Sequence, residues 1–531
     1  MATLERTHPT AEVINQPPPL PEMNLFESDL ALQEGLVREG GGWGADRLRA
    51  IGELAGSEQA RAHVERAERN LPVLHTHDRS GNRVDEVRCD PSWHWLLGEA
   101  VRHEIPSLTW REKRPGAQVV RLAMGYVWGQ LNTGVMCPVI MTFAAASTLN
   151  EYGGPAAARW LERLTLPDYE QGALAGQAFT EKQGGSDLRA TTTYAEPEGD
   201  GTFRLWGHKW FCSAPMCDVF LTLARTDSGL SCFLIERGEG FQLVRLKDKL
   251  GTRSLPSAEV EFRGVCGWLV GDEGRGFAAL VRNLSHARMG PAVGPEMRAA
   301  VVHAIHYSRH RRAFGAPLAE QPAMRNVLAD LAIESEAATV VSLRLAAAYE
   351  DYDAPFRRLA TTVSEYWGCG HVTAHIAEAL QCLGGNGYSE PFGMARLLRD
   401  SAVHAIWEGS GNVIALDVLR AIAKEPASVE AFLAECELAR GANQHLDTHL
   451  DRLAHTLHAV AASDDPQFLA RALAESLALA LNASLLVRHS PGAVADAYCA
   501  GKLGPDRGHA YGTLPAGTDT KAIIDRALPE C

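Results

Sequence analysis

The sequence predicts an α+β protein that is mainly α-helical, and three observations support this fold class. Most of the chain before residue 173 and after residue 275 carries apolar residues at helical spacing, as Ile414, Val418 and Ile422 do. Between residues 173 and 275 the period changes to two, in short runs separated by turns, which is typical of antiparallel strands. The usual dinucleotide-binding, P-loop and nucleophile-elbow signatures do not occur. The pattern indicates a β domain between two helical regions.

The same pattern predicts the domain boundaries. The first segment ends in a proline run that no helix accommodates. In chain order we expect a Pro-rich arm over 1–24, an N-terminal helical domain over 25–172, a β domain over 173–275, a second helical domain over 276–424 and a C-terminal helical extension over 425–531.

Composition narrows the class of protein. The formal net charge is −14, which does not favour indiscriminate binding to nucleic acid. The eleven cysteines form no Cys-x-x-Cys pair, which argues against a zinc ribbon and a disulfide framework. The N-terminus has no apolar signal core, and we find no run of about 18 uncharged apolar residues. We therefore expect a reduced, cytoplasmic, soluble protein with no membrane contact.

The stretch over residues 405–412 is the main candidate for chemistry. It places the carboxylate Glu408 beside the bulky Trp407 and continues into a Gly-Ser-Gly turn. A carboxylate held against apolar and aromatic surface has a raised pKa, in the range that a general base needs. We expect Asn412 to cap the following helix, whose N-terminus is suited to a polar cofactor tail. A solvated first-turn glutamate is the alternative.

Two groups of histidines imitate a metal site. His75 and His77 have no carboxylate or cysteine cluster at ligand spacing, and His303, His306 and His310 occupy one face of a helix without a carboxylate. We expect a turn and a polar helix edge there, and no metal.

Five motifs, taken in their order along the chain, carry a family resemblance. They are residues 179–187 (Phe-Thr-Glu-Lys-Gln-Gly-Gly-Ser-Asp), 207–213 (Gly-His-Lys-Trp-Phe-Cys-Ser), 312–315 (Arg-Ala-Phe-Gly), 381–388 (Gln-x-x-Gly-Gly-Asn-Gly-Tyr) and 406–412 (Ile-Trp-Glu-Gly-Ser-Gly-Asn). In this order and spacing the chain resembles the acyl-CoA dehydrogenase family. With Leu-His-Thr-His-Asp at 74–78 and the added C-terminal helices, it most resembles the AidB (alkylation-response) branch.

The resemblance implies an N-terminal helical domain, a middle β domain, a four-helix domain, non-covalent FAD and a homotetramer in which a neighbouring subunit completes each flavin site. Phe211 matches the aromatic that packs on the flavin, Ser213 the hydroxyl near flavin N5, and Arg312 the arginine that meets the pyrophosphate across an interface. The implied cofactor-binding residues are Phe179, Thr180, Gly185, Ser186, Phe211, Cys212, Ser213, Arg312, Phe314, Gln381, Gly384, Gly385, Ile406, Trp407, Ser410 and Asn412. Thr180, Ser186 and Arg288 are the implied substrate contacts.

The implied chemistry is α,β-dehydrogenation of an acyl thioester, with Glu408 as the base and flavin N5 as the hydride acceptor. The family's acyl-CoA binders keep an acid with an arginine on the helix over the substrate. Here residues 283–288 keep Arg288 but have Ser285 and His286 in place of the acid, so a CoA ester and a substrate of another shape both stay open. A flavin-dependent oxygenase or N-oxidising enzyme is one alternative.

An alkylation-protection protein that binds DNA is the other alternative, because the AidB branch is associated with DNA binding through a basic C-terminal domain. Residues 425–531 instead contain eight Lys/Arg and fourteen Asp/Glu, which gives 8 − 14 = −6. This charge makes DNA binding doubtful.

Overall fold

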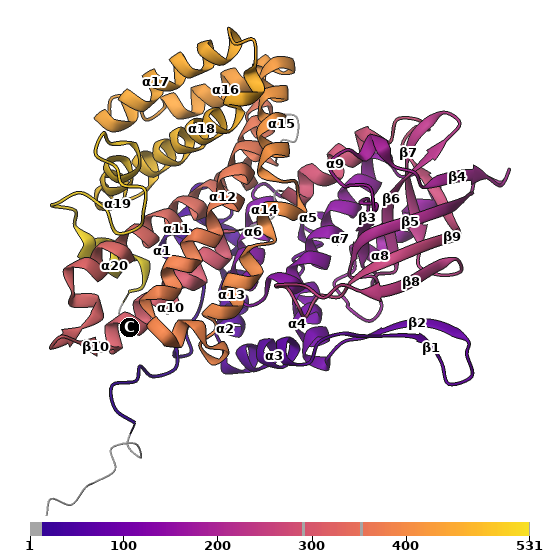
Figure 1. Cartoon of the computed structure of the whole chain (residues 1–531), viewed down its shortest axis with the longest axis horizontal. Helices are drawn as coiled ribbons and strands as arrows, with labels where there is room; N and C mark the ends of the chain where they lie inside the picture. The colour runs from indigo at the N-terminus through magenta and orange to yellow at the C-terminus, as the bar shows by residue number, and fades with distance from the viewer. Residues whose placement is uncertain (1–12, 289–292, 351–353, 530–531) are drawn as a thin grey trace, which may run out of the picture.

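The computed structural model describes residues 13–288, 293–350 and 354–529. The first twelve residues of the expected Pro-rich arm lie outside the described residues, and the part that is described is extended up to about residue 24. In Figure 1 the helical body lies on one side of the molecule and the β domain on the other. The expected α+β, mainly α architecture is confirmed.

The N-terminal region is a helical layer with one hairpin. Its core buries Trp93, Tyr126 and Trp128 together with Leu343 and Ala346 of the later helix α11, so this layer is anchored on the central helices. Its elements are α1 (Leu30–Arg38), α2 (Ala45–Ala55), α3 (Glu58–Arg69), β1 (Val73–His77), β2 (Arg83–Arg88), α4 (Pro91–Arg102), α5 (Leu108–Arg111), α6 (Ala117–Gly129), α7 (Thr133–Tyr152) and α8 (Pro155–Leu164).

The β1–β2 hairpin, which projects beneath the sheet in Figure 1, confirms the turn expected after His77. The Asp78 carboxylate accepts the main-chain N–H groups of Ser80 and Asn82 and so fixes that turn. Among the described residues, no group of three His, Cys, Asp or Glu side chains is arranged to hold a metal ion.

The middle of the chain forms a seven-stranded sheet in the order β3-β6-β4-β5-β9-β7, with β8 paired to β9. Strand β6 also pairs with β7, so the strands close on themselves. Their alternating inward residues bury one core under the sheet, which is the physical reason for the period of two. The strands are β3 (Ala175–Ala178), β4 (Tyr194–Pro197), β5 (Phe203–Ser213), β6 (Val219–Thr226), β7 (Gly229–Glu236), β8 (Phe241–Leu246) and β9 (Ser257–Val270).

The next region is again helical, apart from a hairpin whose two strands have two residues each. Long helices α11 and α12 pack against α10, and their contact surface forms the largest apolar core of the molecule. The elements are α9 (Gly276–Arg288), α10 (Gly294–His310), β10 (Arg312–Ala313), β11 (Ala316–Pro317), α11 (Pro322–Ala348), α12 (Pro355–Cys382), α13 (Met394–Ser401), α14 (His404–Trp407) and α15 (Gly411–Lys424).

The C-terminal helices pack on this core as one more layer, shown in orange and yellow in Figure 1. Buried ion pairs attach them: Lys502 Nζ lies 2.8 Å from Asp330 and 2.7 Å from Glu334 of α11. The elements are α16 (Pro426–Glu437), α17 (Gln444–Ala461), α18 (Pro466–His489), α19 (Gly492–Tyr498) and α20 (Thr520–Ala527).

Helices α7 and α18 are long and apolar enough to cross a membrane by length and composition alone. Both are largely buried by the rest of the protein, as core helices are, so this is weak evidence for a span.

Candidate active site

Glu408 lies at the C-terminal end of the short helix α14, where the chain turns sharply. Gly409 has φ +120°, and a Cβ atom there would lie 2.8 Å from Ile414 Cδ1. Only glycine fits both the backbone angle and the space. The turn lets the chain leave α14 and enter α15 while Glu408 remains between the helices.

Arg288, at the end of α9, holds the main chain of the base. Its Nη2 and Nε atoms donate to the Glu408 carbonyl oxygen at 2.7 and 3.2 Å. This arginine is the expected substrate contact, and the structure places it in the site. Its guanidinium is engaged with the backbone of Glu408, so it positions the base.

Glu408 lines a cavity that α6, α7, α10 and α14 border. Its Oε2 atom is buried and has no hydrogen-bond partner. Burial and, to a smaller extent, the neighbouring Glu365 raise the pKa of Glu408 to about 8, although Arg288 opposes the shift. The expected perturbed carboxyl group is therefore present, and the alternative of a solvated glutamate is wrong.

A second buried carboxyl group, Glu365 of α12, lines the same cavity. Burial raises its pKa, while Arg288 and a hydrogen bond from the Cys369 thiol act in the opposite direction. The sequence analysis did not single out Glu365, because a glutamate within a long amphipathic helix looks like an ordinary surface residue.

A third polar group, formed by His404 of α14 and Glu296 of α10, also borders this cavity. His404 Nε2 lies 3.1 Å from Glu296 Oε1, and neither side chain reaches solvent. The hydroxyl of Thr133 donates to the same carboxylate oxygen. Sequence reasoning missed these residues too, since they come from three distant segments; the only local signal is that His404 precedes Glu408 by one helical turn.

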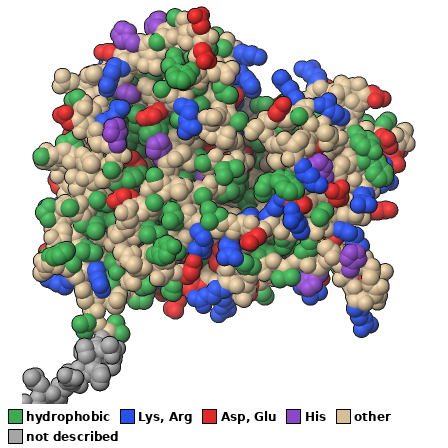
Figure 2. All heavy atoms as spheres, in the orientation of Figure 1, with side chains coloured by type: hydrophobic (Ala, Val, Ile, Leu, Met, Phe, Trp, Pro, Cys, Tyr) green, Lys and Arg blue, Asp and Glu red, His purple; other side chains and the backbone are tan. Residues whose placement is uncertain are grey.

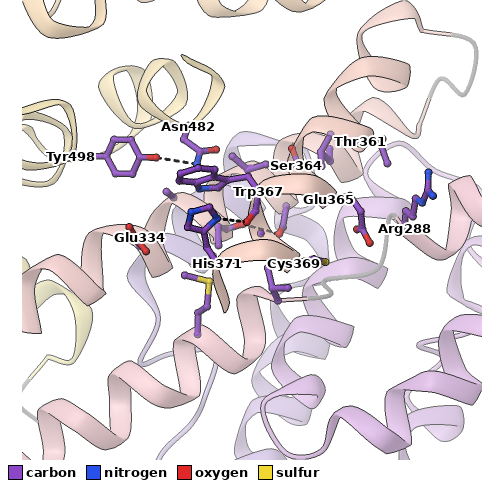
Figure 3. A pocket seen from close by; sticks show the side chains of 18 residues that line it. Arg288, Glu334, Thr361, Ser364, Glu365, Trp367, Cys369, His371, Asn482 and Tyr498 are labelled. Carbon is purple, nitrogen blue, oxygen red and sulfur yellow. Dashed lines mark hydrogen bonds between the residues drawn. The ribbon is translucent and has the colours of Figure 1, made fainter. Parts of the chain in front are cut away.

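A larger cavity, of about 710 Å³ empty volume, lies on the other side of Arg288 and Glu365. Figure 3 shows these two residues at one end and Glu334, Asn482 and Tyr498 at the other. Its far wall thus comes from the C-terminal helices α18 and α19. Arg288 and Glu365 border both cavities.

The two β-domain motifs meet at the edge of the sheet. Trp210 N donates to the Thr180 carbonyl oxygen at 2.8 Å, which places the loop after β3 beside β5. Thr180 is partly exposed, and the Phe211 side chain is 49% exposed, which is unusual for a phenylalanine on a strand. The loop and the strand thus lie side by side, and each has a side chain that reaches solvent.

Buried polar contacts hold this loop in place. The Glu181 carboxylate accepts the main-chain N–H groups of Thr192 and Thr193, and Lys209 Nζ donates to it at 2.9 Å. In the same loop a Cβ atom on Gly185 would lie 2.5 Å from Thr180 Oγ1, so the small residue is required there. Glu181 and Lys209 are positioning residues that the motif contained but sequence reasoning did not interpret.

The β domain and the base are linked through Cys137 of α7. The Ser213 side chain, at the end of β5, lies beside Cys137, and Cys137 lines the cavity with Glu408. Trp407 packs against the core of the β domain. The structure therefore brings Ser213, Trp407 and Glu408, from distant parts of the sequence, to one place.

The other expected cofactor residues on these segments differ in exposure. Phe179 and Cys212 are buried in the cores of the sheet, so only their main chain can face a cofactor. Ser186, Ile406 and Ser410 are exposed.

Asn412 does not cap α15. The helix begins at Gly411, Ser410 occupies the N-cap position without a side-chain cap bond, and Asn412 lies within the first turn. The Asn412 side chain instead accepts a hydrogen bond from Arg471 at 3.2 Å. The prediction failed because α15 begins two residues earlier than the sequence pattern suggested.

The remaining expected cofactor residues gather at the far end of the helical domain. Asn15 donates to the Arg312 carbonyl oxygen, and its neighbour Gln16 bonds to Asn386, next to Gly384 and Gly385. The Phe314 side chain is 98% exposed at the tip of the β10–β11 hairpin, and Gln381 is also exposed. Figure 1 shows β10 at the opposite side of the molecule from β5. One chain therefore contains two separate sets of expected cofactor residues.

The first set fits a flavin. It offers exposed or partly exposed hydroxyl groups (Thr180, Ser186), an exposed aromatic face (Phe211) and a glycine loop that lets a large planar group approach the backbone. It adjoins a mostly apolar cavity that contains a carboxyl group of raised pKa. A flavin site next to a general base is consistent with this donor set.

Three family models match the chain in succession. The AidB N-terminal domain matches residues 15–171, the acyl-CoA dehydrogenase middle domain residues 176–265, and the acyl-CoA dehydrogenase C-terminal domain residues 274–423.

Individual relatives support the same family. The chain is 38% identical over 513 residues to the putative acyl-CoA dehydrogenase AidB of Escherichia coli, covering 92% of this chain and 94% of that protein. It is 35% identical over 422 residues to acyl-CoA dehydrogenase family member 11 of Caenorhabditis elegans, covering 73% and 68%. The crystal structure of Caenorhabditis elegans ACDH-11 in complex with C11-CoA is similar, with a TM-score of 0.83, 27% identity, and 98% and 94% coverage.

The geometry of the site and these similarities lead to one assignment. The chain belongs to the acyl-CoA dehydrogenase family, in which it is AidB-like, and it is an FAD-dependent oxidoreductase that acts on CH–CH groups.

Proposed function

We propose that this protein removes two hydrogens from adjacent carbons of an acyl thioester and that Glu408 is the base. The observation that carries the proposal is the buried, unpartnered Oε2 atom of Glu408, which has a pKa of about 8 and lines a mostly apolar cavity beside the flavin-site residues. The C–H bond at the α carbon breaks, its proton passes to Glu408, and a double bond forms between the α and β carbons. FAD, when bound, accepts the hydride from the β carbon.

The residues of this chain have distinct parts in the reaction. Arg288 fixes the backbone of Glu408, and the apolar walls exclude water, which keeps the carboxylate basic. The dry cavity also strengthens any hydrogen bond to the thioester carbonyl group. We assign the substrate to the CoA thioesters because the similar ACDH-11 structure contains C11-CoA.

The second part of the proposal is a cytoplasmic homotetramer in which each flavin site is completed by a neighbouring copy. Support comes from the separation of the two sets of expected cofactor residues. Phe314 and Tyr388 belong to the distant set or adjoin it, and are 98% and 83% exposed. Apolar side chains exposed at the tip of a projecting hairpin mark an interaction surface.

The test is the rate at which substrate reduces the bound flavin. Glu408→Gln keeps the shape of the side chain but cannot accept a proton, so this rate should fall by at least about a hundredfold in an acyl-CoA panel under anaerobic conditions. The control is Glu430→Gln on the surface of α16, which should react as the wild type does. An unchanged rate in Glu408→Gln, with oxygen uptake that depends on reduced flavin, would support the oxygenase alternative instead.

A further inference from the structure

Besides Glu408, Arg288 and Glu365, the cavity of the proposed base has one more polar wall. Gly125, Met136 and Ile140 contribute to its apolar surface, whereas Glu296 and His404 are charged or polar groups without solvent contact. A cavity that binds only a hydrocarbon chain does not need such a pair. A buried ion pair is expensive to desolvate and is often less stable than apolar residues of the same volume.

Both members of the pair have unused hydrogen-bonding capacity. Glu296 Oε2 and both ring nitrogens of His404 are buried atoms without a hydrogen-bond partner, although His404 Nε2 lies 3.1 Å from Glu296 Oε1, which accepts the Thr133 hydroxyl. An unsatisfied buried polar atom costs free energy, and native proteins retain few of them. Because both residues line one cavity, their unpartnered atoms indicate a ligand group that satisfies Glu296 and His404 together.

The chemistry of the two atoms restricts that group. Burial disfavours the charged imidazole, but the Glu296, Glu365 and Asp400 carboxyl groups together more than offset this effect, and the pKa of His404 is raised. A protonated His404 offers an N–H donor, and Glu296 offers an acceptor. A methyl group satisfies neither atom, and a carboxylate would be repelled by Glu296. A hydroxyl group satisfies both, because it donates one hydrogen bond and accepts another.

We propose that Glu296 and His404 form a hydroxyl-binding subsite, and that the preferred acyl group therefore carries a hydroxyl beyond the two carbons that react. The hydroxyl donates to Glu296 Oε2 and accepts from His404 Nδ1. Trp407, whose ring lies 5.2 Å from the His404 ring at 82°, keeps the imidazole in place. This inference rests on the proposed acyl thioester substrate.

The experiment compares matched CoA thioesters by titration calorimetry on the FAD-loaded Glu408→Gln protein, in which turnover is blocked. Butyryl-, pentanoyl- and hexanoyl-CoA are each compared with their ω-hydroxy counterparts. Because the pair is fixed in the wall, one chain length should show about ten- to a hundredfold tighter binding of the hydroxylated ligand. At acyl chain lengths whose hydroxyl group does not reach the subsite, the protein should bind the hydroxylated ligand more weakly than the unsubstituted one.

Variants in the same background assign the preference to these residues. Glu296→Leu with His404→Phe removes both polar groups at once, so no charge is left unpaired, and it should abolish the preference. If that variant does not fold, Glu296→Gln, which keeps the shape and an oxygen for Thr133, should reduce the preference. His449→Phe is the matched control: this buried histidine of α17 bonds to the Ser476 carbonyl oxygen at 2.8 Å, outside the cavity, and should leave the preference unchanged.

The outcomes separate the two proposals. Equal binding of both ligands at every length, or a preference that survives the double variant, overturns the subsite and leaves the proposed function intact; an ordered water would then satisfy the pair. If none of the thioesters binds, the proposed substrate class and the subsite are both wrong.

Discussion

Lys209 Nζ lies 2.9 Å from Glu181 Oε1, and both side chains are completely shielded from solvent. Lys209 also donates to the Leu223 carbonyl oxygen at 3.0 Å. Although burial disfavours the charged carboxylate, Lys209 and the Thr193 hydroxyl hold the pKa of Glu181 below its usual range. The pair joins two of the five sequence motifs, so the loop that carries Thr180 and Ser186 is fixed to the sheet.

The first prediction follows from this pair. Lys209→Met leaves Glu181 buried without its counter-charge, and the free energy of unfolding should fall by about 3–5 kcal/mol. Urea unfolding measures the loss, and FAD should dissociate more readily because the loop is released. Adding Glu181→Leu to this variant should recover part of the stability. A wild-type midpoint in Lys209→Met would show that the pair does not hold the loop.

The second prediction concerns pH. The base acts only when it is ionised, so flavin reduction by substrate should increase with pH, with a midpoint near 8. Glu365→Gln removes a neighbouring negative charge, which lowers the pKa of Glu408 and moves the midpoint to lower pH. Stopped-flow profiles of both proteins measure the shift. A midpoint that stays in place, or moves to higher pH, would exclude Glu365 as the neighbour that acts on the base.

Stability provides a third prediction, with the opposite pH trend. The pKa of Glu408 is higher in the folded protein than in the unfolded chain, so the folded state binds the proton more tightly. Between the unfolded pKa of about 4.5 and the folded pKa of about 8, deprotonation therefore costs stability as pH rises. Glu408→Gln cannot ionise, and its melting temperature should exceed that of the wild type by several degrees at pH 8 and differ little at pH 4. Equal melting temperatures at both pH values would mean that the carboxyl group is not buried.

The fourth prediction tests the exposed hairpin. Phe314→Asp places a charge at the interaction surface proposed there, so sedimentation velocity should show a smaller assembly, and Arg312→Ala should weaken FAD retention. Phe468→Asp is a matched control, because Phe468 is also an exposed phenylalanine, at 85%, but lies on α18. Unaltered assembly and FAD content in both hairpin variants would place the subunit contact elsewhere.

The fifth prediction concerns nucleic acid. Figure 2 shows Lys and Arg side chains interspersed with Asp and Glu over the visible face, and the net charge of the chain is −14. Because phosphate binding is driven mainly by counterion release at Lys and Arg, duplex DNA should bind no more tightly than the non-specific range of about 10⁻⁴ to 10⁻⁶ M at physiological salt. Nanomolar, salt-sensitive affinity in an anisotropy titration would restore the alkylation-protection alternative.

The sequence by itself determined the fold class and the position of the proposed base. Local spacing sets which segments are helices and which are strands, and the Trp407–Glu408–Gly409 turn is specified by adjacent residues, so both could be predicted without coordinates. The cap at Asn412 was the local exception, since Gly411 begins the helix one residue before it.

Only the tertiary structure decided what surrounds the base. Glu365, His404 and Glu296 come from three helices, and each alone looks like a polar residue on an amphipathic surface. Their burial, and therefore their pKa shifts and unpaired atoms, arises when α10, α12 and α14 pack around one cavity. Desolvation is a property of this packing, and sequence spacing does not encode it.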